Sequence, residues 1–595
     1  MSFPVRRNIA TKRSNLITRS LLSIKQATEV KNVFSHALES CLRYPAAGVR
    51  DFSAMSESCF THLQQKIVSA TIQIENHEPN AKFAKLSLAQ EEVRNLLARF
   101  SGTPVQRITS DTTIYQLGLD SISVIQLVAM LNKEKSISVS AADILERPKL
   151  SKLAMLLENQ QQLSDLTSRF DFESFEASYR SQVSVELELA DVESVRPCTP
   201  MQMGLLAQFL QSKNNYINAM GYELDGYDTS MVTRAWQVLA ATHPILRTSF
   251  APIENTDFSF AMISYRVHAK RPWIEVMESK LDLETLRTES AEKFKSELGN
   301  PPWRVLLSKT PRGVYMQLVM FHGLYDAHSL QIILSDLRVA LQSTSIIPPQ
   351  PADHLLEEIL LSSFPQKKEG KNTNLDSASS FWRRHLLGAS SGRFPCLIPL
   401  RSSTGRTAHL SKSCSIPLKE LTAGCKNIGI TLQAAGQGAW ARLLSAYIGD
   451  SNVVFGFVLS GRDVTAEADS IAFPTIVAIP IAVDTGKSTK EMLSAITNYN
   501  ASARRYQFSP LNRIQRWIGR LNEVLFDTIF VLQKSSGTAS QSAWIPTEEI
   551  STAEVSFDFV TPVVCRIRLT DIVCCLSRVR MYYRRPTGYP SHFPS

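Results

Sequence analysis

The sequence VYMQLVMFHGLYDAH, residues 314–328, joins a long apolar run to a short polar turn. The almost uniformly apolar run from Val314 to Phe321 predicts a strand buried on both faces. After the turn, apolar residues recur at helical spacing and predict a helix; they are Leu330, Ile333, Leu334 and Leu337. His322 therefore lies at the end of a core strand, in a loop of the kind that often carries catalytic residues.

His322 and Asp326 are the candidate catalytic residues of this turn. An imidazole with an ordinary pKa of about 6.5 can take a proton from an amine or alcohol that attacks a thioester. Asp326 can hold the loop through an arginine, with Arg462 and Arg247 as candidates. Two alternatives are a purely structural pair and a metal site completed by His328.

A second motif, Leu117-Gly118-Leu119-Asp120-Ser121, precedes a predicted helix. Asp120 is a suitable N-cap, and Ser121 falls in the first turn, where free amides and the helix dipole favour a phosphodiester. An ordinary capped helix is the alternative. The surrounding apolar spacing predicts a bundle of three or four helices; the residues are Val93, Leu96, Leu97, Phe100, Val124, Leu127, Val128, Leu131, Leu150, Leu153, Leu156 and Leu157.

Residues 85–160 resemble the peptidyl carrier domain, through the Leu-Gly-Leu-Asp-Ser motif and the order of the helices around it. The resemblance implies a four-helix bundle with 4'-phosphopantetheine, derived from coenzyme A, on Ser121. It also implies a phosphopantetheinyl transferase as a partner.

Residues 194–560 resemble the condensation domain of nonribosomal peptide synthetases. The matching stretches are residues 197–202, 243–248, 302–304, the His322 turn, 455–462 and 525–528. The resemblance implies an α/β fold of two chloramphenicol-acetyltransferase-like lobes around a tunnel, with His322 as the catalytic histidine. Departures are Phe321 and Ala327 in the motif, and Thr475-Ile476-Val477 where the family has an Asn-Thr pair. The form His-x-Leu-Tyr-Asp is similar to ferrichrome-type siderophore synthetases of fungi.

The remaining segments complete the predicted domain organisation. Residues 1–84 form a basic leader with a remnant of an upstream condensation domain, including a helix near Glu29 to Leu42. Residues 161–193 form a linker, and the condensation domain divides into lobes at about 194–345 and 378–560. Residues 561–595 form a basic tail that fits no domain, which we interpret as a gene-model artefact.

The charge and composition narrow the possible partners and location. Of the 595 residues, 44% are hydrophobic and 20% are charged, which indicates a globular chain, and the net charge is +9. Residues 1–32 hold seven Lys or Arg and one Glu, and residues 562–595 hold six Arg and one Asp. The positive charge thus lies in the two ends, and we expect neither a nucleic acid partner nor a membrane span. Nine cysteines without a paired spacing favour the cytoplasm, although the basic start also fits a mitochondrial presequence.

The sequence predicts a carrier and condensation unit of a fungal nonribosomal peptide synthetase, active in siderophore peptide biosynthesis. It would join thioester-bound intermediates through an amide or ester bond. Adenylation and carrier domains of the same or another synthetase, and acyl or aminoacyl thioesters, are the expected partners. The alternative is a non-catalytic docking module or a truncated relic.

Overall fold

The structure is a computed structural model. It describes the following residues: 87–119, 123–124, 127–128, 130–131, 139–159, 169–183, 191–211, 216–267, 273–342, 351–364, 373–389, 410–413, 417–465, 467–521, 523–533, 547–550, 563–568 and 573–578. The predicted helix near residues 29–42, the predicted attachment residue Ser121 and its neighbour Asp120 lie outside the described residues.

The carrier domain is a helical unit with its own hydrophobic core. Its described helices are α4 (Leu88–Ser101), α6 (Ala141–Glu146) and α7 (Leu150–Asn159), with a 3₁₀ turn at Val105–Arg107. Ser87 begins α4 with a capping box, in which its hydroxyl and the Gln90 side chain satisfy amides that the first turn leaves without a partner. The predicted apolar positions of this domain, from Val93 to Leu156, lie almost entirely in one buried cluster.

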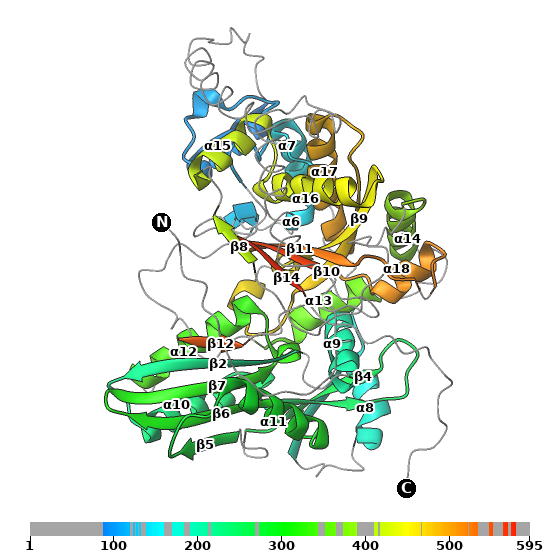
Figure 1. Ribbon diagram of the computed structural model, residues 1–595. Coiled ribbons are helices and arrows are strands. Elements are labelled where there is room, and N and C mark those ends of the chain that lie inside the picture. The colour runs from blue at the N-terminus through cyan, green and yellow to red at the C-terminus, as the bar shows by residue number, and fades with distance from the viewer. Residues whose placement is uncertain are drawn as a thin grey trace.

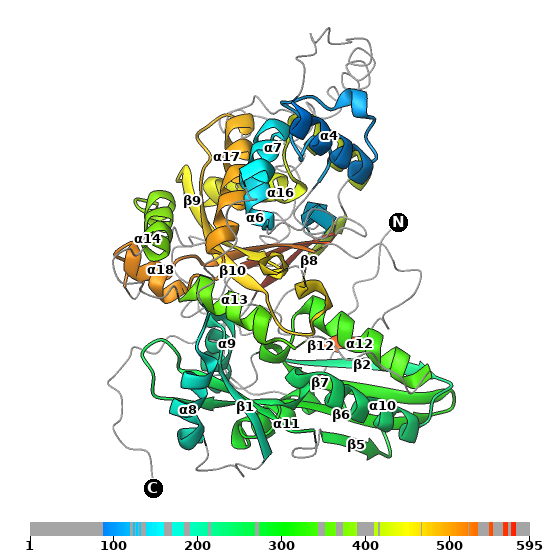
Figure 2. The ribbon, with the colours of Figure 1, turned by 180° about the vertical axis from the view of Figure 1, so that it is seen from behind.

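The first lobe of the condensation domain is a five-stranded sheet in the order β12-β2-β7-β6-β5. Helix α11 covers one face of this sheet, and α10 and α12 cover the other (Figures 1 and 2). The elements are β2 (Ile217–Asp225), β5 (Trp273–Met277), β6 (Trp303–Thr310), β7 (Gly313–Phe321), β12 (Glu548–Ile550), α10 (Thr229–Thr242), α11 (Leu283–Ser296) and α12 (Ala327–Gln342).

A small antiparallel sheet in the order β1-β4-β3 extends this lobe, together with α8 and α9. The elements are β1 (Val192–Pro197), β3 (Thr248–Pro252), β4 (Phe260–Tyr265), α8 (Phe172–Val183) and α9 (Pro200–Gln211). The predicted strand of residues 314–321 is confirmed as β7, and the predicted helix after the turn is confirmed as α12.

The second lobe is a six-stranded sheet in the order β10-β9-β11-β13-β14-β8, with α16 and α17 packed on it. Its strands are β8 (Leu410–Ser413), β9 (Asn452–Leu459), β10 (Val477–Asp484), β11 (Thr528–Gln533), β13 (Val563–Arg568) and β14 (Val573–Arg578). Its helices are α13 (Asp353–Ser363), α14 (Thr373–Leu386), α15 (Leu418–Ile428), α16 (Leu432–Ile448), α17 (Thr489–Ala503) and α18 (Leu511–Trp517).

The lobes are less separate in sequence than the predicted boundaries suggest. Strand β12, from the second half of the chain, pairs antiparallel with β2 in the first-lobe sheet. Two segments of the predicted tail also form strands, since β13 pairs in parallel with β11, and β14 joins β13 to β8. Backbone hydrogen bonding thus places residues 563–568 and 573–578 in the condensation fold, which the composition of the tail alone did not indicate.

Candidate active site

His322 lies where strand β7 ends and the chain turns towards α12. Its backbone amide donates to the Tyr216 carbonyl oxygen at 2.8 Å, and residues His322–Leu324 form one 3₁₀ turn. The ring Nδ1 lies 2.8 Å from the Tyr325 carbonyl oxygen. Because a carbonyl oxygen only accepts, Nδ1 carries the proton in the neutral ring, and Nε2 has the lone pair. His322 is therefore in the tautomer that a general base requires.

The ring of Tyr325 supports the histidine from one side. The two rings are stacked, with centroids 4.9 Å apart and an interplanar angle of 17°. The Tyr325 hydroxyl is 2.5 Å from Asn218 Nδ2 on β2, and both residues are buried. Gln202 on α9 donates to the Gly323 carbonyl oxygen at 3.0 Å. Side chains from two other elements thus fix the turn from both ends.

Asp326 is held by Arg462 of the second lobe. The distances from one guanidinium nitrogen, Nη2, to the two carboxylate oxygens are 2.9 and 3.1 Å, and both side chains are almost fully buried. Arg462 also donates to the carbonyl oxygens of Ala468, Ile471 and Phe473 at 2.5, 2.8 and 2.6 Å. The predicted pairing of Asp326 with an arginine is present, and of the two candidates Arg462 is the partner.

Arg247, the other candidate, has a different role. Its guanidinium donates to the carbonyl oxygens of Tyr265, Ala240 and Ala241 and pairs with Glu193. It therefore ties α10 to the small sheet of the first lobe.

Asp326 stays ionised because its partners outweigh its burial. Burial alone would raise the pKa of Asp326, but the Arg462 charge and the amides of Ser329 and Thr475 hold this pKa below its ordinary value. The Ser329 amide donates to Oδ1 at 2.8 Å and the Thr475 amide to Oδ2 at 2.9 Å. With these partners the ionised Asp326 carboxylate ties the His322 turn to the second lobe.

The segment Thr475-Ile476-Val477, which departs from the family pattern, contacts Asp326. Thr475 is buried, and its hydroxyl donates to the Ser460 carbonyl oxygen at 2.6 Å. The Thr475 amide completes the anchor of Asp326, as described above. Ile476 and Val477 are the next two residues of this segment. This segment therefore retains a structural contact with the His322 loop although its side chains differ from the family pattern.

Phe321, which replaces the first histidine of the motif, is a core residue. It is fully buried and packs against Phe209 and Phe250, with ring centroids 5.0 and 5.8 Å away. A Cβ atom added to Gly323 would lie 2.3 Å from Phe321 Cε1. The turn therefore needs glycine at position 323 to accommodate this ring.

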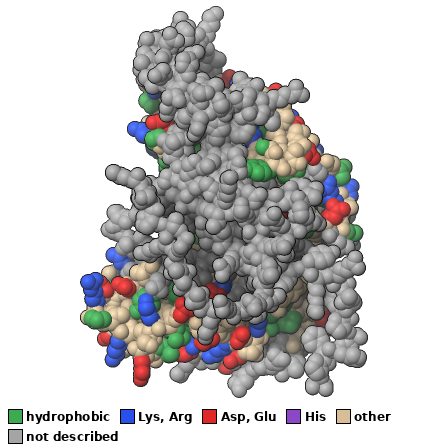
Figure 3. Space-filling model, viewed as in Figure 1, with side chains coloured by type: hydrophobic (Ala, Val, Ile, Leu, Met, Phe, Trp, Pro, Cys, Tyr) green, Lys and Arg blue, Asp and Glu red, His purple; other side chains and the backbone are tan. Residues whose placement is uncertain are grey.

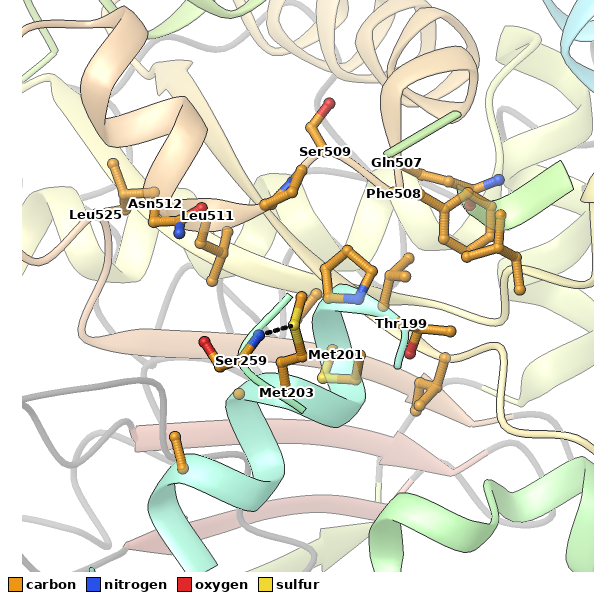
Figure 4. Close-up of a pocket in the computed structure, with 18 of the residues that line it drawn as sticks. Thr199, Met201, Met203, Ser259, Gln507, Phe508, Ser509, Leu511, Asn512 and Leu525 are labelled. Atoms are coloured by element: carbon orange, nitrogen blue, oxygen red, sulfur yellow. Dashed lines mark hydrogen bonds between the residues drawn. The ribbon is translucent and has the colours of Figure 1, made fainter. Parts of the chain in front are cut away.

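One cavity of about 380 Å³ opens between α9 and the second lobe. Figure 4 shows Met201 and Met203 of α9 on one side and the chain from Gln507 to Asn512 on the other. The Ser259 amide donates to Met203 Sδ at 3.4 Å. Thr475 and Ile476 also line this cavity, so it reaches the segment that anchors Asp326.

A second cavity of about 310 Å³ lies between the carrier and condensation domains. The carrier contributes Tyr115 and Leu145, and the condensation domain contributes Asp326, Ala327 and other residues, among them Ile476. Ile476 lines both cavities, so both reach this segment of the chain. Local sequence does not single out Tyr115 or Leu145 as lining residues, since their place in the cavity depends on how the two domains dock.

The residues around the second cavity fit an extended arm on the carrier. Gly118 of the motif has a φ of +79°, and a Cβ atom there would lie 1.8 Å from Lys426 Cε on α15. The glycine thus allows the motif to approach the condensation domain closely. From the carrier side chains Tyr115 and Leu145, the cavity continues to Asp326 and Ala327, four and five residues after His322 in the sequence.

The described part of the chain holds neither a cluster of metal ligands nor a helix that could span a membrane. It contains no group of three His, Cys, Asp or Glu residues that could hold a metal ion. His328 lies in the first turn of α12, with Nε2 2.8 Å from the Asp469 carbonyl oxygen. Every helix of this part is too short or too polar to cross a lipid bilayer.

Comparisons with known proteins agree with this geometry. The condensation domain model matches residues 192–563, and the phosphopantetheine attachment site model matches residues 91–157. Nonribosomal peptide synthetase 2 of Gibberella zeae is 35% identical over 76% of this chain, and the hydroxamate-type ferrichrome siderophore peptide synthetase of Schizosaccharomyces pombe is 27% identical over 74%. The chain spans 9% of the length of each.

The solved condensation domain of the monacolin K polyketide synthase MokA has the same fold, with a TM-score of 0.51 and 15% identity, over 66% of this chain and 93% of that one. The buried Asp326 anchor, the oriented His322 and the family matches lead to one assignment. The chain belongs to the condensation domain family of nonribosomal peptide synthetases and carries a phosphopantetheine attachment domain in front of it.

Proposed function

We propose that this chain forms an amide or ester bond between thioester-bound intermediates, with Ser121 as the attachment residue and His322 as the general base. When bound, 4'-phosphopantetheine supplies the thiol that carries the acyl group. His322 Nε2 takes the proton of the attacking amine or hydroxyl as the new bond to the acyl carbon forms. The carbon–sulfur bond then breaks, and the protonated imidazole returns its proton to the leaving thiolate.

The orientation of His322 carries this proposal. Its Nδ1 donates a hydrogen bond to the Tyr325 carbonyl oxygen, so in the neutral ring Nε2 is the basic atom. Asp326 keeps the turn in place through Arg462 and is a positioning residue. Two cavities that both reach Ile476 support separate places for a donor and an acceptor.

The proposed partners follow from the carrier and condensation domains. A phosphopantetheinyl transferase would load Ser121, and adenylation and carrier domains would supply the two substrates. The ferrichrome-type relative supports a product of the siderophore peptide class. A cytoplasmic location is proposed from the cysteine pattern and from Cys198 and Cys425, which are buried free thiols.

Mass spectrometry tests the attachment residue. The full chain is incubated with coenzyme A and a phosphopantetheinyl transferase, and the mass of one phosphopantetheine should be gained. Ser121→Ala should gain none. An equal mass gain in both chains would contradict the assignment of Ser121.

Single-turnover transfer tests the role of His322. The chain is loaded with an acyl group from acyl-coenzyme A, an aminoacyl N-acetylcysteamine thioester is the acceptor, and product is followed by mass. His322→Gln should lower the rate by about 10²–10⁴-fold. The matched control is His354→Gln, since His354 is exposed on α13, and it should keep the wild-type rate. A loaded wild-type chain that forms no product would instead support the docking-module alternative.

A further inference from the structure

The carrier docks on the condensation domain through a forked ion pair. Arg505, just after α17, places Nε 3.2 Å from Glu146 Oε1 and Nη2 2.9 Å from Glu146 Oε2. The same Nη2 lies 2.9 Å from Asp143 Oδ1, and both acids belong to α6. Figures 1 and 2 both show α6 beside α17, and Ala501 of α17 is buried in the hydrophobic cluster of the carrier.

The neighbouring arginine points the other way, into the condensation domain. Arg504 Nη1 lies 2.7 Å from Asp463 Oδ2, and the two side chains are 6% and 2% exposed. Gln507 donates to the other oxygen of Asp463 at 3.0 Å. A pair this deeply buried has a fixed geometry, because removing either partner would leave a charge without compensation.

Asp463 is in turn the neighbour of Arg462, the residue that anchors Asp326. Both belong to the 3₁₀ turn Arg462–Val464, which α6 of the carrier also contacts. Two pairs of residues, each adjacent in the sequence, therefore connect the carrier interface to the Asp326 anchor. Arg505 contacts the carrier, and its neighbour Arg504 contacts Asp463. Asp463 is followed back along the chain by Arg462, which contacts Asp326 of the His322 loop.

We propose that Arg504 and Asp463 are positioning residues that couple carrier docking to the placement of the His322 loop. A docked carrier holds Arg505 and the turn Arg462–Val464 in one arrangement, and the buried ion pairs transmit it to Asp326. Packed interiors respond to such shifts by changing between discrete arrangements rather than by deforming smoothly. The proposal rests on the proposed function, since it gives the loop a catalytic purpose.

Hydrogen exchange of the full chain tests the coupling without turnover. The Thr475 amide donates to Asp326, and the Asp326 amide donates to Ser329 Oγ at 2.7 Å, so peptides that cover them report the anchor. Arg505→Gln should speed exchange of α6 and of these two peptides by about two- to fivefold. Glu146→Gln, made on the carrier side, should reproduce the effect.

Arg287→Gln is the matched control. Arg287 makes a similar fork with Glu284, with distances of 3.1 and 2.5 Å, but lies on α11 at the opposite end of the molecule from α6 (Figures 1 and 2). It should leave the two loop peptides unchanged. Faster exchange of α6 alone in Arg505→Gln, or no change anywhere, would overturn the coupling.

The connecting pair is tested by the rate of transfer. Arg504→Gln should lower kcat for the acyl group on Ser121, and Arg504→Lys, which keeps the charge, should restore part of it. Arg505→Gln combined with Asp463→Asn should cost less than the product of the two single effects, because both break one connection. Single effects that multiply would contradict the proposal.

The two readouts separate failure of the coupling from failure of the proposed function. Exchange that responds to Arg505→Gln in a chain without turnover would keep the coupling and overturn the catalytic role. If turnover depends on His322 but Arg505→Gln leaves hydrogen exchange of the loop unchanged, the catalytic role would stand and the coupling would be overturned.

Discussion

Two arginine–carboxylate contacts, one across the carrier interface and one inside the condensation domain, differ in burial. The Arg462 side chain is 3% exposed and Asp326 is 5% exposed, whereas Arg505 is 43% exposed and its partners Asp143 and Glu146 are 20% and 24% exposed. Both arginines contact more than one acceptor, so the number of contacts does not distinguish them. The exposure of the side chains to water distinguishes the two contacts.

This difference separates a permanent anchor from a reversible contact. A buried pair cannot lose one partner without leaving a desolvated charge, so it fixes the loop in one place. A half-exposed pair exchanges its partner for water at little cost. A carrier that must deliver and leave needs the second kind of contact, and a catalytic loop needs the first.

The largest effect is expected where the buried anchor is broken. Arg462→Met removes the positive charge that compensates the buried Asp326 carboxylate and the donor to three carbonyl oxygens, and the free energy of unfolding should fall by about 3–5 kcal/mol. Urea unfolding followed by tryptophan fluorescence measures this, since four fully buried tryptophans lie in the condensation domain; they are Trp236, Trp303, Trp382 and Trp440.

The double variant Arg462→Met/Asp326→Leu sharpens this test. It removes both charges, so it should lose less free energy of unfolding than Arg462→Met alone. A single variant that costs less than about 1 kcal/mol would show that the anchor behaves like a surface pair.

A smaller effect is expected from overpacking the turn itself. In Gly323→Ala the new methyl group would meet the Phe321 ring, and the free energy of unfolding should fall by about 1–3 kcal/mol. Gly424→Ala in α15 is the control, because nothing lies within 4 Å of the added Cβ atom. It should be neutral or stabilising, and equal losses in both would contradict a steric cause.

Acid should weaken the anchor in a defined direction. The pKa of Asp326 is lowered in the folded chain, so its stabilisation is fully present above the unfolded-state value of about 3.9. It is lost as the pH falls through the lower folded-state pKa. Comparing the free energy of unfolding of wild-type and Asp326→Asn across this range checks the sign. Wild-type stability that rises relative to the variant as the pH falls would contradict it.

The smallest effect is expected at the exposed contact. Arg505→Gln should change the free energy of unfolding by less than about 1 kcal/mol, because water screens a half-exposed pair. Raising the salt to about 1 M should abolish even this difference, while the Arg462→Met difference persists. Urea unfolding at both salt concentrations measures this, and a salt-independent loss would mean that Arg505 acts through packing.

Much of the active-site loop could be predicted from local sequence. The apolar run ending at Phe321 and the periodic residues after Asp326 placed His322 in a turn between a strand and a helix, as the structure confirms. The expectation that an arginine holds Asp326 is also confirmed. The roles of Ser121, His322 and Asp326 and the domain boundaries stay predictions.

Contacts between distant segments could not be predicted. Nothing near Asn218 or Gln202 indicates that they support the His322 turn, because they lie more than 100 residues before it. Strand β12 and the strands of the supposed tail show the same limit. These strands pair through backbone hydrogen bonds across the sheet, and such pairing has little effect on the amino-acid composition of a strand.

The sequence by itself determined the domain families, the likeness of the turn to a catalytic motif and the neutral character of the recognisable domains. Figure 3 is consistent with the last point, since Lys or Arg and Asp or Glu side chains are interspersed on the described face of the first lobe. Only the tertiary structure decided which arginine anchors Asp326 and where the carrier docks. Periodicity and motifs arise from neighbours along the chain, whereas burial and ion pairing depend on which distant segments exclude water together.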